Sequence, residues 1–417
     1  MRTVASIDIG TDKIVALIGE VDTYGDLHIV GVGESKARGV DKGTITRLEV
    51  AARAIATSVR EAEEMSGQKV TEVVINVSGS TVKSQNEKDT INISPSPVEV
   101  EEEHIHRLVE RSVARGKEDG YDIVHAIPRR YMLDDQEGIE DPVGLIGSKL
   151  TAQVHIVKVG TTVSRNLEKA VVSAGFQPTM RVVSAIASAN AVLSEEEKDE
   201  GVLLIDMGAS LTDFVLYLEG YPVVTGCITL AGNVITKDIS SYMKIDPEHA
   251  EKIKREEGVA LVDLVKEGEI IKIKPRGEDR EISIEKSTLA EVIQIRLEEI
   301  VEKIVEKIEG SGYKLDGANA GVVITGGCAN LTGIKEFLER FTDLPARVGV
   351  PSGLIGLKEK IEDSKYSTAV GLLKFRVSPE GVAPAGSRIE VQSNGLGKGL
   401  DLKGLIEKFK NFLREIM

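Results

Sequence analysis

The chain has 417 residues, of which 41% are hydrophobic, so it is too long for one ordinary core and apolar enough to fill two or three. Its 52 basic and 67 acidic side chains give a net charge of −15, which argues against a general nucleic-acid role because phosphates would repel it. Two cysteines, Cys227 and Cys328, exclude a disulfide framework or a zinc cluster. With no long apolar run and no secretory signal, we expect a cytoplasmic protein.

The first 80 residues predict strands and one helix. Residues 4–9, 14–18 and 27–32 are apolar-rich and separated by turns, so we expect three strands there. Over residues 46–66 apolar side chains recur at helical spacing, and residues 72–77 predict another strand. Strands that alternate with helices predict an α/β layer fold with a mostly parallel or mixed sheet.

A short motif near the N-terminus recurs about half a chain later. Ile7-Asp8-Ile9-Gly10-Thr11 is echoed by Ile205-Asp206-Met207-Gly208-Ala209-Ser210. Each copy ends a strand with an aspartate and turns through a glycine into a second strand, which we place at 211–218 in the second copy, followed by a third at 223–229. Asp-x-Gly alone is ordinary turn chemistry, but two copies in matched strand contexts favour a phosphate-binding clamp.

The chemistry of these turns suits a nucleotide. Turns without bulky side chains let backbone N–H groups approach phosphate oxygens, and the hydroxyls of Thr11 and Ser210 can add donors. An aspartate at the end of each strand can hold the water shell of Mg²⁺. A third turn, Gly326-Gly327, follows a predicted strand at 321–325 and precedes a predicted helix at 331–341. Its bare backbone can lie against a purine or ribose, although packing alone can also require such a turn.

Together these motifs resemble the actin, sugar-kinase and chaperone-ATPase superfamily, and within it the FtsA family of bacterial cell-division actins. The narrower matches are His125-Ala126-Ile127-Pro128, Gln136-Glu137-Gly138-Ile139 and Asp141-Pro142-Val143-Gly144-Leu145, which resemble a subdomain peculiar to that family. That subdomain is inserted at a different place from the corresponding actin subdomain. Residues 231–239 and 367–373 also match, and the likeness runs from Ser6 to about Phe375 and resumes at the extreme C-terminus.

The resemblance implies an α/β, two-lobed actin-like fold, which duplicates a ribonuclease-H-like unit and carries an inserted FtsA-type subdomain and a C-terminal amphipathic helix. Lobe I then comprises core residues 1–80 and 161–193 with a C-terminal helix at 355–376, and the inserted subdomain spans 81–160. Lobe II comprises core residues 194–236 and 320–354, with an outer subdomain at 237–319 that covers ATP and binds partners. A flexible linker at 377–399 and a membrane-binding helix at 400–417 complete the chain.

The resemblance also implies that ATP and Mg²⁺ bind between the lobes. By motif, Asp8 and Asp206 would organise Mg²⁺ through water, and the nucleotide would contact Gly10, Thr11, Lys13, Gly208, Ala209, Ser210, Gly232, Asn233, Glu251, Lys254, Gly326 and Gly327. The second turn departs from the superfamily pattern, because Ala209-Ser210-Leu211 replaces two or three glycines. No Gln or His in these motifs orients an attacking water, so we assign no catalytic residue. We expect slow ATP hydrolysis at most, in a protein that is primarily a nucleotide-dependent scaffold.

The last 17 residues predict an amphipathic helix after a linker rich in Pro, Gly and Ser. Its apolar face spans an arc of roughly 140° at 100° per residue, and cations lie along one edge. The apolar residues are Leu402, Leu405, Ile406, Phe409, Phe412, Leu413 and Ile416, and the cations are Lys403, Lys410 and Arg414. Such a helix is typical of membrane interfaces. Packing on its own protein and a coiled coil are the alternatives.

One residue of the predicted helix at 287–310 is a candidate for partner binding. Arg296 lies in a stretch that resembles the part of FtsA that holds the acidic C-terminal peptide of FtsZ, the division tubulin; a surface ion pair with Glu298 or Glu299 is the alternative. The resemblance therefore implies a protein that polymerises, binds other division proteins and tethers FtsZ to the cytoplasmic face of the inner membrane at the division site. A small-molecule kinase or phosphatase and an actin-like pilus-assembly scaffold are the alternatives.

Overall fold

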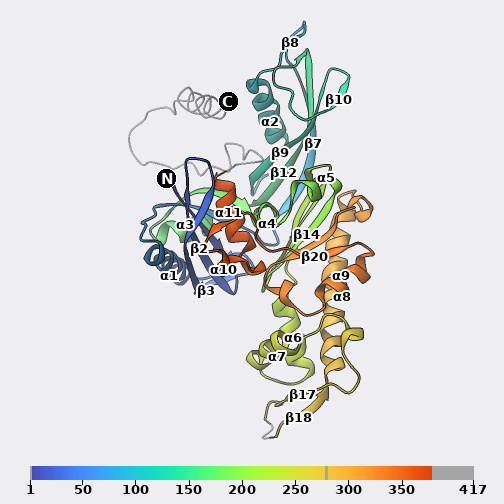
Figure 1. Cartoon of the computed structure of the whole chain (residues 1–417). Helices are drawn as coiled ribbons and strands as arrows, with labels where there is room; N and C mark the ends of the chain where they lie inside the picture. Colours follow the sequence, from blue (N-terminus) through green and yellow to red (C-terminus); the bar gives the residue numbers. More distant parts are fainter. Residues whose placement is uncertain (1, 278–279, 378–417) are drawn as a thin grey trace.

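The computed structural model describes residues 2–277 and 280–377. Within them the chain forms two lobes, each built on its own mixed sheet, and a further subdomain that extends away from the lobes (Figure 1). The predicted linker at 377–399 lies outside the described residues from position 378 onward, as does the whole predicted membrane helix at 400–417.

Lobe I is built on a six-stranded sheet in the order β13-β6-β1-β2-β3-β21. The strands are β1 (Arg2–Ile9), β2 (Lys13–Val21), β3 (Leu27–Lys36), β6 (Glu72–Val77), β13 (Gln177–Val183) and β21 (Ile355–Gly356). The first three form an antiparallel meander, whereas β6, β13 and β21 each pair in parallel with their neighbours. A short hairpin of β4 (Val40–Asp41) and β5 (Thr44–Ile45) follows the meander.

Two pairs of helices pack on this sheet. One pair is α1 (Leu48–Ser66) and α3 (Thr161–Ser173), and the other is α4 (Ser184–Val192) and α11 (Ser367–Val377). Helices α4 and α11 approach so closely that a Cβ at Gly371 would lie 1.7 Å from the carbonyl oxygen of Ala187. The end of the described chain is thereby held against lobe I.

Lobe II repeats the architecture of lobe I. Its five-stranded sheet has the order β16-β15-β14-β19-β20, formed by β14 (Val202–Met207), β15 (Thr212–Leu218), β16 (Tyr221–Ile228), β19 (Gly321–Thr325) and β20 (Ala346–Val348). As in lobe I, an antiparallel meander is followed by strands that pair in parallel with its first strand and with each other. The duplicated fold predicted from the repeated motif is therefore present.

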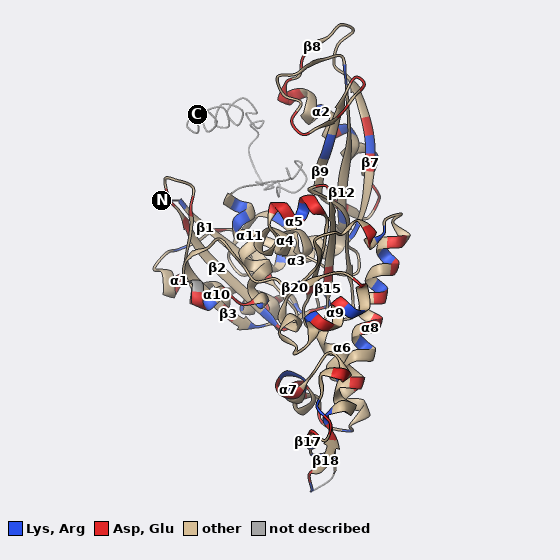
Figure 2. Cartoon of the chain, turned by 45° about the vertical axis from the view of Figure 1, so that its right-hand side comes forward, with Lys and Arg blue, Asp and Glu red and all other residues tan. Residues whose placement is uncertain are grey.

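Helices surround the lobe II sheet and build its outer part. They are α5 (Glu195–Glu200), α6 (Gly232–Tyr242), α7 (Pro247–Glu257), α8 (Lys286–Gly310) and α9 (Ile334–Thr342), with a hairpin of β17 (Ile270–Ile273) and β18 (Ile282–Glu285) at the far end. The long helix α8 buries Leu, Ile, Val and Ala side chains in the lobe II core and shows acidic and basic side chains outward (Figure 2).

The inserted subdomain projects from lobe I between β6 and α3 (Figure 1). An antiparallel sheet in the order β10-β9-β12-β7 packs against helix α2 (Glu102–Gly116). The strands are β7 (Lys83–Asn92), β9 (Tyr121–Leu133), β10 (Gln136–Ile139) and β12 (Lys149–Gly160), and a small pair of β8 (Val98–Glu99) and β11 (Ile146–Gly147) lies beside them.

The predicted elements agree with this fold except at some boundaries. The helix predicted at 331–341 begins only at Ile334, because Gly333 adopts a positive φ of 77° and serves as its N-cap. The segment 355–376, predicted as a C-terminal helix, contains β21, α10 (Lys358–Ile361) and a 3₁₀ turn before α11. Within residues 2–277 and 280–377, no helix is long and apolar enough to cross a bilayer.

Candidate functional site

A cleft of about 730 Å³ is lined by residues of both lobes, and both aspartate–glycine turns open into it. Most of the residues predicted from the motifs line this cleft. They are Asp8, Gly10, Thr11, Lys13, Asp206, Gly208, Ala209, Gly232, Asn233, Glu251, Lys254, Gly326 and Gly327. Because the repeated turns are nearly 200 residues apart in sequence, only the duplicated fold brings them to one cavity.

The two turns have matching backbone geometry. In the first, a Cβ at Gly10 would lie 2.6 Å from the carbonyl oxygen of Lys13, so a side chain there would require the turn to shift. In the second, the Gly208 N–H donates to the carbonyl oxygen of Leu211 at 2.9 Å, and a Cβ at Gly208 would lie 3.3 Å from that oxygen. In both turns a glycine thus packs against the carbonyl three residues ahead.

Hydrogen bonds fix the two predicted magnesium aspartates. The Asn76 side-chain amide donates to Asp8 Oδ1 at 2.8 Å, and its own carbonyl oxygen accepts from the Ile9 N–H. The hydroxyls of Ser188 and Thr368 donate to Asp206 Oδ2 at 2.5 and 2.9 Å. Burial raises the pKa of Asp8 to about 7, helped by the charge of Asp206, and burial also raises the pKa of Asp206.

A third buried carboxylate, Asp213, lines the same cleft, and the sequence analysis did not single it out. It pairs with Asp206 across β14 and β15, and its Oδ1 accepts a hydrogen bond from the Ser78 hydroxyl at 2.5 Å. Burial, and then the neighbouring Asp206, raises the pKa of Asp213 to about 8. The sequence did carry a signal for Asp213, because it is an acidic residue in an otherwise largely apolar strand. An unpaired charge is costly in such a strand.

The first turn also supplies a buried cation. The ammonium group of Lys13 lies 4.3 Å from the centre of the Tyr366 ring and 3.8 Å from Glu34 Oε2. Among the described residues it has no hydrogen-bond partner, and burial lowers its pKa. A buried ammonium group with all its donors free at the edge of a cleft is suited to an anionic ligand.

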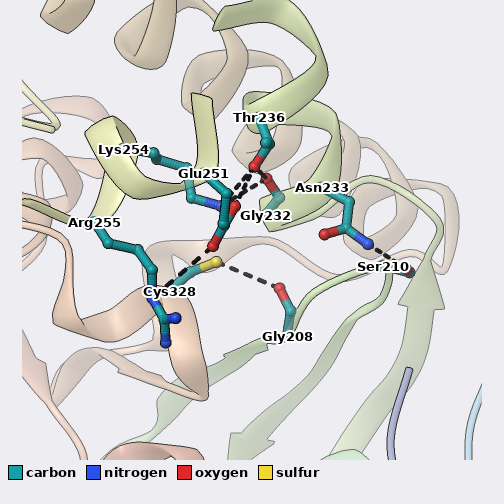
Figure 3. A network of polar contacts seen from close by, with 9 residues as sticks. All are labelled: Gly208, Ser210, Gly232, Asn233, Thr236, Glu251, Lys254, Arg255 and Cys328. Carbon is teal, nitrogen blue, oxygen red and sulfur yellow. Dashed lines mark hydrogen bonds and ion pairs between the residues drawn. The ribbon is translucent and has the colours of Figure 1, made fainter. Parts of the chain in front are cut away.

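The start of α6 is tied to the second turn by backbone hydrogen bonds. The backbone N–H groups of Gly232 and Asn233 donate to the carbonyl oxygens of Gly208 and Ala209 at 3.2 and 2.7 Å, so they are not free donors for a ligand. The Asn233 side chain donates to Ser210 Oγ at 2.9 Å (Figure 3). Ser210 is buried behind Asn233 and is the one predicted nucleotide contact that does not line the cleft.

Helix α7 adds a compact polar network to the lobe II side (Figure 3). The Lys254 ammonium donates to Glu251 Oε2 at 2.6 Å, to Thr236 Oγ1 at 2.8 Å and to the Gly232 carbonyl oxygen at 3.0 Å. All three donors of Lys254 are therefore in use, so it positions Glu251 and the start of α6. This pairing with Lys254 and Thr236 lowers the pKa of Glu251, although burial opposes it.

The predicted adenosine turn closes the other side of the cleft. Gly326 has a φ of 84°, and a Cβ there would lie 2.4 Å from Asp206 Oδ1, so only glycine fits. A Cβ at Gly327 would meet nothing within 4 Å, which leaves open space beside its backbone. The Ser364 hydroxyl donates to the Gly326 carbonyl oxygen at 2.9 Å and holds the turn in place.

Arg296 lies on the outer part of lobe II, away from the cleft lining. Its guanidinium donates to Asp238 at 2.6 Å and also to Glu299, whereas Glu298 accepts from Gln294. The ion pair with Glu299 that the sequence left as an alternative is present, and Asp238 of α6 extends it. Any acidic ligand would therefore share Arg296 with these two carboxylates.

Comparison with known proteins decides the family. Residues 203–371 match the family described as cell division protein FtsA. The chain is 35% identical over 399 residues to the cell division protein FtsA of Neisseria meningitidis serogroup B, covering 96% of both chains. It is also 34% identical over 381 residues to that of Escherichia coli K12, covering 90% of both. The chain belongs to the FtsA family of cell division proteins.

Further matches agree with this FtsA assignment. Residues 79–158 match the SHS2 domain inserted in FtsA, which confirms the inserted subdomain of the predicted fold. A type IV pilus PilM–PilN structure has a TM-score of 0.64 at 16% identity and covers 90% of this chain and 99% of that one. MreB5 of Spiroplasma citri bound to ADP has a TM-score of 0.56 at 16% identity, covering 91% and 98%. These likenesses establish the actin-like fold.

Proposed function

We propose that this FtsA-family protein is an actin-like scaffold of cell division that binds ATP with Mg²⁺ in the cleft between its lobes. The observation that carries the proposal is the convergence of two matched aspartate–glycine turns on one cleft of about 730 Å³. A structure of the same fold, MreB5 of Spiroplasma citri, was solved with ADP and also with AMPPNP. The cleft is large enough for a ligand of that size.

The residues of the cleft fit the phosphates and the cation. On the lobe I side, the backbone at Gly10 and Thr11 offers donors to phosphate oxygens, and so does the Lys13 ammonium, which donates no hydrogen bond to the described residues. Asp8 and Asp206, each held by hydrogen bonds, would bind the water shell of Mg²⁺. When bound, the cation offsets the negative charge that three buried carboxylates would otherwise place beside a triphosphate.

The remaining contacts come from lobe II and reach the phosphates, the ribose and the base. Gly208 and Ala209 would approach the phosphates from lobe II, and Glu251 would face the ribose or purine opposite the open backbone of Gly326 and Gly327. Lys254 and Asn233 would hold this side in shape through their own hydrogen bonds. We propose that the main role of the nucleotide is structural: it holds the two lobes together so that contacts between subunits fit. Hydrolysis is secondary, and turnover is slow at most.

The proposal extends to assembly and attachment. The protein polymerises, binds other division proteins, and holds the acidic C-terminal peptide of FtsZ on the outer part of lobe II, where Arg296 lies. Residues 400–417, through the apolar and basic side chains named above, attach the filament to the cytoplasmic face of the membrane at the division site. Because one such helix binds weakly, many copies in one filament would supply the needed avidity.

Calorimetry of Asp206→Ala tests the cleft. We expect this variant to lose measurable binding of Mg²⁺-ATP, because it removes a carboxylate at the junction of both lobes. Asp316→Ala, which removes an exposed carboxylate outside the cleft lining, should bind like the wild type. Unchanged affinity in Asp206→Ala would reject the placement of the phosphates.

Vesicle flotation tests the attachment. The intact chain should float with vesicles that contain anionic lipid, whereas a chain that ends at Gly399 should stay in the soluble fraction. Equal flotation of the two chains would rule out the membrane tether while leaving the nucleotide proposal intact.

A further inference from the structure

The inserted subdomain is fastened to lobe II as well as to lobe I. Its edge strand β7 lies beside β16, the edge strand of the lobe II sheet, without a backbone ladder between them. Side chains of β7 take the place of that ladder: Ser84 Oγ accepts from the Thr225 N–H at 2.8 Å, and the Asn86 amide donates to the Val223 carbonyl oxygen at 2.9 Å. Side chains of two alternate residues of β7 thus form hydrogen bonds with the backbone groups of two alternate residues of β16.

A buried histidine strengthens the same junction. His155 of β12 lies 2.7 Å from Asn86 Oδ1 through Nδ1 and 2.9 Å from Thr225 Oγ1 through Nε2. Because the Asn86 amide nitrogen donates to Val223 and to the Tyr313 hydroxyl, its oxygen must accept, so His155 donates through Nδ1 and accepts through Nε2. Burial lowers the pKa of His155 to about 3, which keeps the ring neutral, as this pattern requires.

A third link joins the inserted subdomain to the cleft itself. Ser78 directly follows β6, and the SHS2 match begins at the next residue. Its hydroxyl donates to Asp213 of lobe II at 2.5 Å, and both residues are buried. Asp213 lies opposite Cys227 of β16, which is two residues from Thr225 and shares its face of the sheet. Contacts with the inserted subdomain therefore run from the cleft along β16.

We propose that Ser78 is a positioning residue that couples occupancy of the cleft to the inserted subdomain. The inference rests on the proposed nucleotide function. A cation beside Asp8 and Asp206 would attract the Asp213 carboxylate, which is linked to Ser78 by a hydrogen bond. The backbone at Ser78 has little room to absorb a shift, because a Cβ at Gly43 would lie 2.6 Å from the Ser78 carbonyl oxygen. A movement of Asp213 is then passed to the first strand of the inserted subdomain.

Hydrogen exchange of the full chain, with and without Mg²⁺-ADP, tests this coupling. In the wild type, nucleotide should change amide exchange at residues 79–92 by at least about threefold, as well as at residues 206–213. Ser78→Ala should still bind Mg²⁺-ADP in calorimetry and keep the response at 206–213, but lose the response at 79–92. Ser78→Thr, which keeps a hydroxyl, should restore it.

A matched control separates coupling from loosened packing. Thr90→Val removes the hydroxyl contact between Thr90 and Thr151, 2.8 Å apart in the same sheet but away from lobe II, and it should leave the response at 79–92 unchanged. A full response at 79–92 in Ser78→Ala, or none in the wild type, would overturn the coupling alone. Loss of nucleotide binding in Ser78→Ala would also overturn it, because Ser78 would then belong to the binding site. Absence of binding in the wild type would overturn the proposed function.

Discussion

Neutralising Asp213 should stabilise the nucleotide-free protein at neutral and alkaline pH. The carboxyl is buried beside Asp206 and Asp8, and it accepts a hydrogen bond from the Ser78 hydroxyl. An Asp213→Asn substitution keeps the shape and the acceptor for Ser78 but removes an ionisable group whose charged form burial disfavours. Residues that bind ligands are commonly retained at such a cost to stability.

The magnitude follows from the pKa of Asp213, which is about 8 in the folded chain against an ordinary value of 3.8. Between these values the folded chain binds a proton that the unfolded chain has lost, so this group's contribution to stability is fully present below about pH 4 and falls as the pH rises towards 8. At about 1.4 kcal/mol per unit, the wild type loses roughly 4 kcal/mol by pH 7. The Asn variant does not.

Urea unfolding at pH 4 and pH 8, without Mg²⁺ or nucleotide, measures this difference. We expect the free energy of unfolding of Asp213→Asn to exceed that of the wild type by on the order of 2–5 kcal/mol at pH 8. At pH 4 the difference should be under about 1 kcal/mol. The exposed control Asp316→Asn should show no such pH-dependent difference. The reasoning fails if Asp213→Asn is less stable than the wild type at pH 8, or if the difference is the same at both pH values.

Two further predictions concern the packing that holds the cleft together. Phe214→Ala removes a fully buried ring from the lobe II core, and urea unfolding should show a loss of about 3–5 kcal/mol; a loss below 1 kcal/mol would contradict that burial. Gly371→Ala places a methyl 1.7 Å from the Ala187 carbonyl oxygen and should lower the melting temperature by several degrees, through a loss of at least about 2 kcal/mol. Gly310→Ala, at the end of α8 with nothing within 4 Å of the new methyl, should be neutral or slightly stabilising; equal melting temperatures for both variants would argue against the close α4–α11 contact.

The local elements and the duplication were accessible from the sequence alone. Apolar residues at helical spacing predicted a helix at 46–66, where α1 lies, and an apolar run predicted a strand at 72–77, where β6 lies. Such patterns depend on residues a few positions apart in the chain, so they predict helices and strands without knowledge of the tertiary structure. The repeat of Asp8-Ile9-Gly10 at Asp206-Met207-Gly208 predicted a two-lobed site for the same reason, because each copy is a complete strand-and-turn unit.

Only the tertiary structure decided the state of each side chain in the cleft. Asp213 meets Ser78 across 135 positions and Asn76 meets Asp8 across 68, so no local pattern could assign either contact. The same holds for Ser210, which looks like a phosphate donor in the sequence but is buried behind Asn233. Burial, pKa and free hydrogen-bonding capacity depend on atoms brought close by the fold, whereas the turns that carry these residues are set by the backbone on either side of them.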